Sequence, residues 1–166
     1  MTTFNELFRI LFIVLCTFLI ACDLEDSKGT FYPPDNEYKV TITQGVWGNV
    51  WFWEGNFMPG SVSGKITPVI REIYIYEATR HDSVLIDFER YPFIKEVNSN
   101  YFGKVISDKD GFYQVSLSPG KYSLFVKEDT LFYATILDAD GHLMSVEVEA
   151  NKVTKRQIDI DYKAYY

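Results

Sequence analysis

Two short acidic segments are the first places in this sequence where residue type and spacing could do chemistry. Asp108–Gly111 reads DKDG and Asp138–Gly141 reads DADG, so the same D-x-D-G order occurs twice. Carboxylates at alternate positions before a glycine are typical of calcium-binding loops. The residues around each segment have to show whether it binds a metal or turns the chain.

The surrounding residues favour turns. A helix-loop-helix calcium loop has an oxygen ligand five residues before the glycine and a glutamate six residues after it. Around Gly111 these positions hold Ile106 and Leu117, both apolar. Before Gly141 the first position holds Ile136, although a glutamate occupies the second. Glycine tolerates a positive φ and aspartate caps its own backbone, so we predict tight turns there and at the later SPGK segment. The predicted structural turns contain Asp108, Asp110, Gly111, Pro119, Gly120, Asp138, Asp140 and Gly141.

Histidine chemistry has little support in the sequence. His81 and His142 are the only histidines, and His81 lies in the segment Arg80–Ser83, which reads RHDS. A hydrolytic triad brings its members together across a fold, whereas neighbours in one loop diverge. Zinc needs three or four convergent ligands. We therefore expect no enzyme activity, no metal and no cofactor, with metal or small-ligand binding by Asp138–Gly141 as a remote alternative.

The segment Gly45–Gly60 contains all three tryptophans and is the strongest candidate for binding. Alternation along a strand puts the tryptophans on one face and Val46, Val50 and Phe52 on the other. An exposed aromatic row would stack against sugar rings or anchor a partner protein. The alternative, which we favour, is that the loop Gly55–Thr67 covers and buries the row. The possible ligand-binding aromatic residues are Trp47, Trp51, Trp53, Tyr74 and Tyr76.

Short strands are the elements expected to position these residues. Apolar and polar residues alternate with a period of two, which predicts strands with one buried face. The clearest segments are EYKVTIT (37–43), VIREIYIYEA (69–78), MSVEVEA (144–150) and QIDIDYKA (157–164). The segment 81–91 could supply a turn or two of helix. We predict an all-β fold, an antiparallel sandwich of about seven strands that is transthyretin-like or Ig-like.

Composition limits the classes of partner. The chain has 166 residues, of which 47% are hydrophobic and 17% aromatic, enough for a sizeable core in one domain. Its net charge of -7 makes nucleic acid a poor partner.

The N-terminus predicts export. The apolar run Ile10–Ala21 is too short to span a membrane and is typical of a signal peptide. The segment Leu19–Cys22, LIAC, resembles a bacterial lipobox, in which the cysteine becomes the lipidated first residue of the mature protein. The resemblance implies a cleaved signal peptide over residues 1–21 and a permanent membrane anchor at Cys22. Cys16 would leave with the signal peptide, so we expect no disulfide in the domain.

Residues 22–36 are expected to form an acidic tether that contains Pro33 and Pro34. Its acidic residues resemble a signal that some Gram-negative bacteria use for surface lipoproteins. Asp23 beside the cysteine suggests inner-membrane retention in other bacteria, and a merely solvated tether is a further alternative. We expect a bacterial cell-envelope location, lipid-anchored, with the outer membrane favoured.

The segment Ser107–Val126 carries a family resemblance. It reads SDKDGFYQVSLSPGKYSLFV and is similar to the core of the carboxypeptidase regulatory-like domain, in which a D-x-D-G-x-Y/F hairpin precedes a P-G-K-Y turn. The resemblance extends less specifically back to Gly45. It implies a transthyretin-like sandwich, here residues 37–166, that serves as an accessory module without an active site.

Two functions follow as expectations. The first is a non-catalytic accessory or structural lipoprotein that contacts an envelope protein. In the segment 122–127, alternation places Leu124 and Val126 on one face. Ser123, Phe125 and Lys127 lie on the other, a mixed outer face suited to weak protein contact. The alternative is a glycan-binding lipoprotein that uses the exposed tryptophan and tyrosine row.

Overall fold

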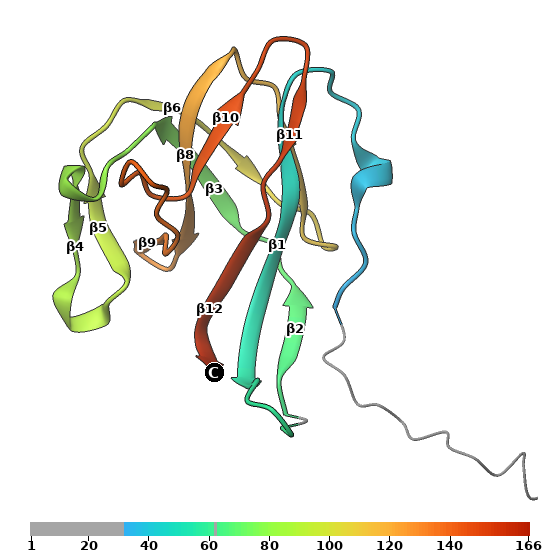
Figure 1. Cartoon of the computed structure of the whole chain (residues 1–166), viewed down its shortest axis with the longest axis vertical. Helices are drawn as coiled ribbons and strands as arrows, with labels where there is room; N and C mark the ends of the chain where they lie inside the picture. Colours follow the sequence, from blue (N-terminus) through green and yellow to red (C-terminus); the bar gives the residue numbers. More distant parts are fainter. Residues whose placement is uncertain (1–31, 62) are drawn as a thin grey trace, which may run out of the picture.

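The chain folds as an all-β sandwich of two sheets, with five and seven strands (Figure 1). A computed structural model describes residues 32–61 and 63–166. The predicted signal peptide, Cys22 and most of the predicted tether lie outside these residues. The all-β sandwich predicted from alternation is confirmed.

The five-stranded sheet is organised around one long strand, β1 (Gly45–Asn56). Antiparallel partners of β1 are β7 (Phe112–Val115) and β2 (Lys65–Pro68). Its parallel partners are β11 (Val153–Lys155) and β12 (Ile158–Tyr165). The parallel pairings are a feature that alternation did not predict, and they arise because the chain crosses from the other sheet before β11.

The seven-stranded sheet is antiparallel throughout. Its strands, in spatial order, are β4 (Val84–Ile86), β5 (Phe93–Val97), β9 (Leu131–Tyr133), β8 (Gly120–Glu128), β3 (Glu72–Glu77) and β6 (Tyr101–Ile106), and β10 (Ser145–Val148) also pairs with β8. Three single-turn 3-10 helices, η1 (Glu37–Lys39), η2 (His81–Ser83) and η3 (Phe88–Arg90), lie in the connections. No helix in the described part of the chain is long and apolar enough to cross a membrane.

The core lies between the two sheets and follows the predicted alternation. Ile73 of β3 and Leu124 of β8 are fully buried from one sheet, and Val50 of β1 and Ile160 of β12 are fully buried from the other. Burying such side chains is the main favourable contribution to folding, because each removes apolar surface from water. The core thus holds β1, β3, β8 and β12 together across the sandwich.

Two predictions about strands were wrong in detail. Residues 37–43 were expected to form a strand, but the structure has η1 there, and Tyr38 remains 80% exposed. A tertiary contact explains the difference, because Lys39 forms ion pairs with Asp108 and Asp110 of the turn at Asp108–Gly111. The described residues also form twelve strands where about seven were expected. Strands as short as β4, β9 and β11 hold three residues each, too few for alternation to reveal them.

The expected outer face of β8 is largely covered. Ser123 and Phe125 are both fully buried, although alternation placed them toward solvent. Phe125 packs edge-to-face against Tyr76, with ring centroids 5.6 Å apart. The Ser123 hydroxyl accepts a hydrogen bond from the backbone N–H of Thr79 at 2.9 Å. Because other segments pack over this strand, β8 is buried on both faces and is not the mixed contact surface that we expected.

Candidate functional site

The first D-x-D-G segment forms a tight turn. The Asp108 Oδ1 atom accepts hydrogen bonds from the backbone N–H groups of Asp110 and Phe112, at 2.9 and 3.0 Å. Gly111 has a φ of 77°, the left-handed conformation expected for this position. A side chain there would collide with the protein, because a Cβ atom would lie 2.6 Å from the Val50 carbonyl oxygen.

A lysine lies between the two carboxylates of each D-x-D-G turn. The Lys39 Nζ atom is 2.8 Å from Asp108 and 2.7 Å from Asp110. At the second turn, the Lys121 Nζ atom is 2.8 Å from Asp138 and 3.3 Å from Asp140. Each ammonium therefore occupies the position between carboxylates that a bound cation would need.

His142 joins the second turn. Asp138, Asp140 and His142 offer ligand atoms within 4.8 Å of one another, a grouping that the sequence analysis missed although the histidine directly follows the DADG segment. The Lys121 Nζ atom lies 3.3 Å from His142 Nδ1 and so contacts all three residues. Hydrogen bonds from Lys121 and from the His142 backbone hold the pKa of Asp138 well below its usual value. Lys121 thus pairs with both carboxylates of the grouping from within the protein. His81 lies beside the grouping, because its backbone N–H donates to the Gly141 carbonyl at 3.0 Å.

The tryptophan row is partly covered by side chains from three segments. Trp47 is only 5% exposed, and the Lys155 Nζ atom lies 5.1 Å from its ring. Trp51 and Trp53 are half-buried. The Tyr32 ring lies 6.2 Å from that of Trp51 and 5.7 Å from that of Trp53. Phe57, from the loop that was expected to cover the row, packs 5.1 Å from Trp53, whereas the contribution of Tyr32 was not expected.

The two candidate tyrosines lie apart from the tryptophans, on the other sheet. Tyr76 is 9% exposed and packs against Phe125, while Tyr74 packs 5.1 Å from Phe132. Because the tryptophans belong to β1 and the tyrosines to β3, the five candidate aromatic residues do not form one surface.

A cavity of about 640 Å³ lies where the two sheets meet, and it was not identified from the sequence. This volume is within the range of small-molecule sites. The cavity is lined by Arg71, Arg90, Phe93, Lys127, Glu128, Asp129, Leu131 and Tyr162. The lining residues come from both sheets and from η3, so the site exists only in the folded protein.

Glu128 fixes two groups of this cavity. Its side chain is 9% exposed and accepts a hydrogen bond from Arg71 Nε through Oε1. The Tyr162 hydroxyl donates to its Oε2 atom at 2.9 Å. Burial, and then the hydrogen bond to Glu128, raise the pKa of Tyr162 to about 12. Tyr162 therefore stays a protonated donor at neutral pH and helps to hold the carboxylate that orients Arg71.

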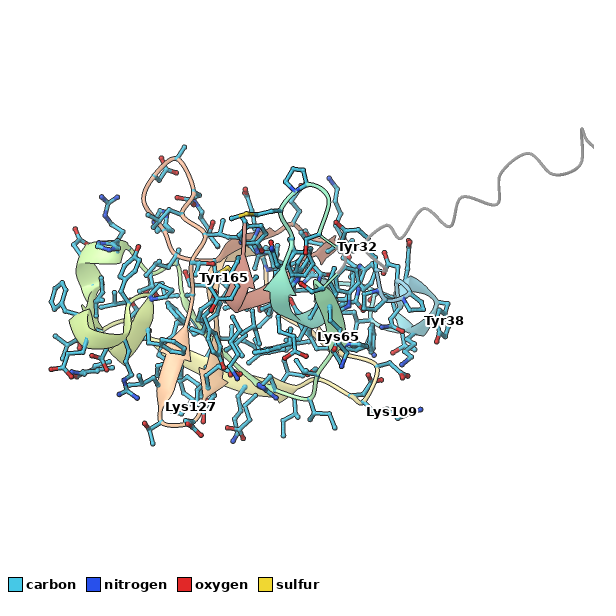
Figure 2. The ribbon with its side chains drawn as sticks, turned by 90° about the horizontal axis from the view of Figure 1, so that it is seen from below. Tyr32, Tyr38, Lys65, Lys109, Lys127 and Tyr165 are labelled. Carbon is cyan, nitrogen blue, oxygen red and sulfur yellow. The ribbon has the colours of Figure 1, made fainter. Side chains whose placement is uncertain are left out.

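Arg90 and Lys127, the other two basic residues of the lining, also have partners within the protein. Asp87 is only 2% exposed, and its Oδ2 atom lies 2.9 Å from Arg90 Nη2. The Lys127 Nζ atom donates to the Thr130 carbonyl at 2.8 Å and lies 4.4 Å from the centre of the Phe132 ring. Arg90 is thus paired with Asp87, and the Lys127 ammonium lies over Phe132, on the face of β8 opposite to Glu128. Figure 2 shows Lys127 well apart from Lys109 and Lys65.

Comparisons with known proteins add no identification. No protein-family model matches the chain, and searches of curated proteins and of solved structures gave no match.

Proposed function

We propose that this protein is a non-catalytic, lipid-anchored accessory module of the bacterial cell envelope, whose sandwich binds an envelope component. The observation that supports a binding role is the lining of the cavity at Arg71, Phe93 and Tyr162. Guanidinium, hydroxyl and aromatic groups recognise ligands through charge, hydrogen bonds and apolar contact.

The cavity is built for recognition more than for reaction. Nucleophilic catalysis commonly pairs a serine or cysteine with a base, and neither type is among the lining residues. Glu128 accepts hydrogen bonds from both Arg71 and Tyr162, so it would have to lose a partner before it could accept a proton. These features favour binding.

The lipoprotein part of the proposal rests on the sequence at Cys22, which resembles a lipobox. Tyr32, the first described residue, lies ten positions after Cys22. A fully extended chain covers roughly 3.5 Å per residue, so the domain would lie within about 35 Å of the anchored cysteine. The carboxypeptidase regulatory-like resemblance stays part of this proposal, and the all-β sandwich with its D-x-D-G turn supports it.

Cys22→Ala tests the anchor. The variant should lose lipid labelling and leave the membrane fraction, since the lipid would be its attachment. A variant that stays membrane-bound after a carbonate wash would contradict the anchor.

Crosslinking in the native bacterium, followed by identification of the captured molecule, tests the accessory role. We expect one envelope protein to be captured by the wild type and lost or reduced with Cys22→Ala. Capture that is indifferent to the anchor, or no reproducible capture, would argue against an envelope accessory.

Glycan binding is the second candidate. Burial of Trp47 and Tyr76 makes the predicted row a poor sugar platform. Phe93 and Tyr162 offer an aromatic pair within the cavity, and that observation supports glycan binding at a different place.

A further inference from the structure

We infer that one end of the sandwich docks on the surface of a lipid bilayer. The inference rests on the proposed anchor at Cys22 and adds the part of the domain that faces the membrane. We call this part the aromatic end, and it consists of Tyr32, Phe57, Met58, Pro59, Tyr165 and Tyr166.

The aromatic end is continuous because its rings are neighbours. The centre of the Phe57 ring lies 5.1 Å from that of Trp53 and 5.9 Å from that of Tyr166. The Tyr32 ring lies 5.7 Å from the same Trp53. The backbone N–H of Phe57 donates to the Tyr165 carbonyl at 2.8 Å, so the end of β12 lies beside the connection from β1 to β2. Figure 1 shows that connection and the C-terminus at the same end of the molecule.

Much of the aromatic end is exposed to solvent. Four of its side chains are 49% to 68% exposed, namely Tyr32, Met58, Tyr165 and Tyr166. Contiguous exposed apolar surface marks sites of contact with a protein or a membrane. Tyrosine and tryptophan are enriched where water meets a bilayer, because their rings are apolar and their hydroxyl or N–H groups are polar. The composition of this end therefore fits a bilayer surface.

The tip of the aromatic end is uncharged. Residues 57–64 read FMPGSVSG and contain no acidic or basic residue, in a chain of which 23% of the residues are charged. The charged residues that flank the β1–β2 connection, Glu54 and Lys65, lie 3.8 Å apart and pair with each other. The tip can therefore approach lipid headgroups without bringing an unpaired charge out of water.

Two carboxylates border the aromatic end, and both accept hydrogen bonds from aromatic residues. Trp53 Nε1 donates to Asp159 at 3.0 Å, and the Tyr166 hydroxyl donates to Asp161 at 3.2 Å. These acidic groups give the end no attraction for anionic lipids. We therefore expect docking on zwitterionic lipids, through the aromatic and apolar side chains.

The position of the anchor selects this end of the molecule. Asn36 is buried and donates to Asn49, so the chain leaves the sandwich at a fixed place close to Tyr32. From there the chain reaches Cys22 in ten positions, about 35 Å when fully extended. A tether this short gives an effective concentration of roughly millimolar, so a weak contact with the bilayer is populated once the chain is anchored.

A second group of exposed aromatic residues serves as a comparison. Phe88 and Tyr91, in the connection between β4 and β5, are also highly exposed. Figure 1 shows β4 and β5 on the opposite side of the molecule from β2. Exposure alone does not separate the two groups, whereas the place where the chain leads toward Cys22 favours the aromatic end.

The fluorescence of one labelled cysteine tests the inference. In the mature lipoprotein Cys16 has been removed and Cys22 carries lipid, so Met58→Cys supplies one free thiol for an environment-sensitive dye. The lipidated chain is reconstituted in vesicles of phosphatidylcholine and phosphatidylethanolamine. We expect the dye on Met58→Cys to show blue-shifted emission that spin-labelled lipid quenches. Phe88→Cys is the matched control, and its dye should keep the emission that it has in water.

Three results would overturn the inference. The first is water-like emission from the dye on Met58→Cys, and the second is an equal shift from the dye on Phe88→Cys. The third is a shift that spin-labelled lipid does not quench, which would assign the aromatic end to a contact with protein, such as a second copy of the chain.

A charge at the aromatic end tests whether it touches the bilayer. Tyr165→Glu, combined with the labelled Met58→Cys, should lose most of the blue shift because a carboxylate resists removal from water. Phe88→Glu adds the same charge elsewhere and should retain the shift. Both replaced side chains are exposed, and thermal melts check that the variants are folded. An unchanged shift in folded Tyr165→Glu would contradict docking through this end.

Flotation of the vesicles separates this inference from the proposed anchor. If the chain floats with the vesicles and the dye on Met58→Cys stays in water, the docking surface is wrong and the anchor stands. If the chain does not float, the anchor is wrong and the docking inference falls with it.

Discussion

The side-chain amide of Asn36 donates a hydrogen bond to the side-chain oxygen of Asn49 over 2.7 Å, and both residues are buried. The same Asn36 amide also donates to the Asp110 carbonyl at 2.9 Å. Asn49 in turn donates to Asp35 at 3.2 Å. The last residues of the predicted tether are therefore packed against β1 and are part of the folded domain.

Asn49→Ala should lower the free energy of unfolding by about 1 kcal/mol, because it removes the buried hydrogen bond between Asn36 and Asn49 and leaves the Asn36 amide with only the Asp110 carbonyl as a partner. Urea unfolding at neutral pH measures this change. Asn98→Ala, an exposed asparagine, serves as the control and should be close to neutral. Equal stability of the two variants would contradict a structural role for the Asn36–Asn49 pair.

Gly111→Ala should destabilise the protein more than Gly60→Ala. Both glycines have a positive φ, of 77° and 84°, so both variants should incur backbone strain of about 1 kcal/mol. A Cβ atom at Gly111 would also lie 2.6 Å from the Val50 carbonyl oxygen, whereas one at Gly60 has no atom within 4 Å. The difference between the two unfolding free energies measures the collision with β1. A smaller loss at Gly111 would refute the close approach.

Asp138→Asn should make the folding stability of the protein less dependent on pH in the acid range. The hydrogen bond from Lys121, together with the His142 backbone, lowers the pKa of Asp138 below the ordinary value of 3.8. A lowered pKa in the folded state means that the carboxylate stabilises the fold above 3.8 and that this contribution is lost as the pH falls below it.

Urea unfolding midpoints of wild type and Asp138→Asn should therefore differ at neutral pH and converge in acid. Asp82→Asn, an exposed carboxylate outside the turn, is the control and should show little difference at either pH. A gap for Asp138→Asn that stays constant into strong acid would show that its effect is not electrostatic.

Tyr162→Phe should reduce the loss of folding stability that the wild type shows at alkaline pH. Burial first, and then Glu128, raise the pKa of Tyr162 from 10.0 to about 12. Because the unfolded state loses this proton at lower pH, the contribution of Tyr162 is complete below 10.0 and is lost between there and about 12.

The wild type should therefore lose stability across that alkaline range more steeply than Tyr162→Phe. Thermal melts at several alkaline pH values measure the two slopes. Tyr91→Phe, which changes a tyrosine that is 74% exposed, should follow the wild type. Parallel curves for wild type and Tyr162→Phe would show that Tyr162 does not contribute in this way.

The sequence alone determined features that depend on near neighbours. Alternation at Ile73–Ile75 and at Ile158–Ile160 predicted strands that the structure contains, with these isoleucines in the core. The glycine of the DKDG segment predicted a tight turn, and Gly111 has the positive φ that the turn requires. Backbone preference and periodicity are encoded within a few residues, so a short segment is enough to reveal them.

Tertiary structure alone decided which groups meet. Arg71 and Glu128 are 57 positions apart in the chain, and Lys39 and Asp108 are 69 apart, yet each pair is in contact. Phe125 is buried because other segments pack over β8, which its own alternation did not reveal. The partner of a charge and the second covered face of a strand depend on how the sheets pack. The cavity follows from the same packing, since its walls come from both sheets.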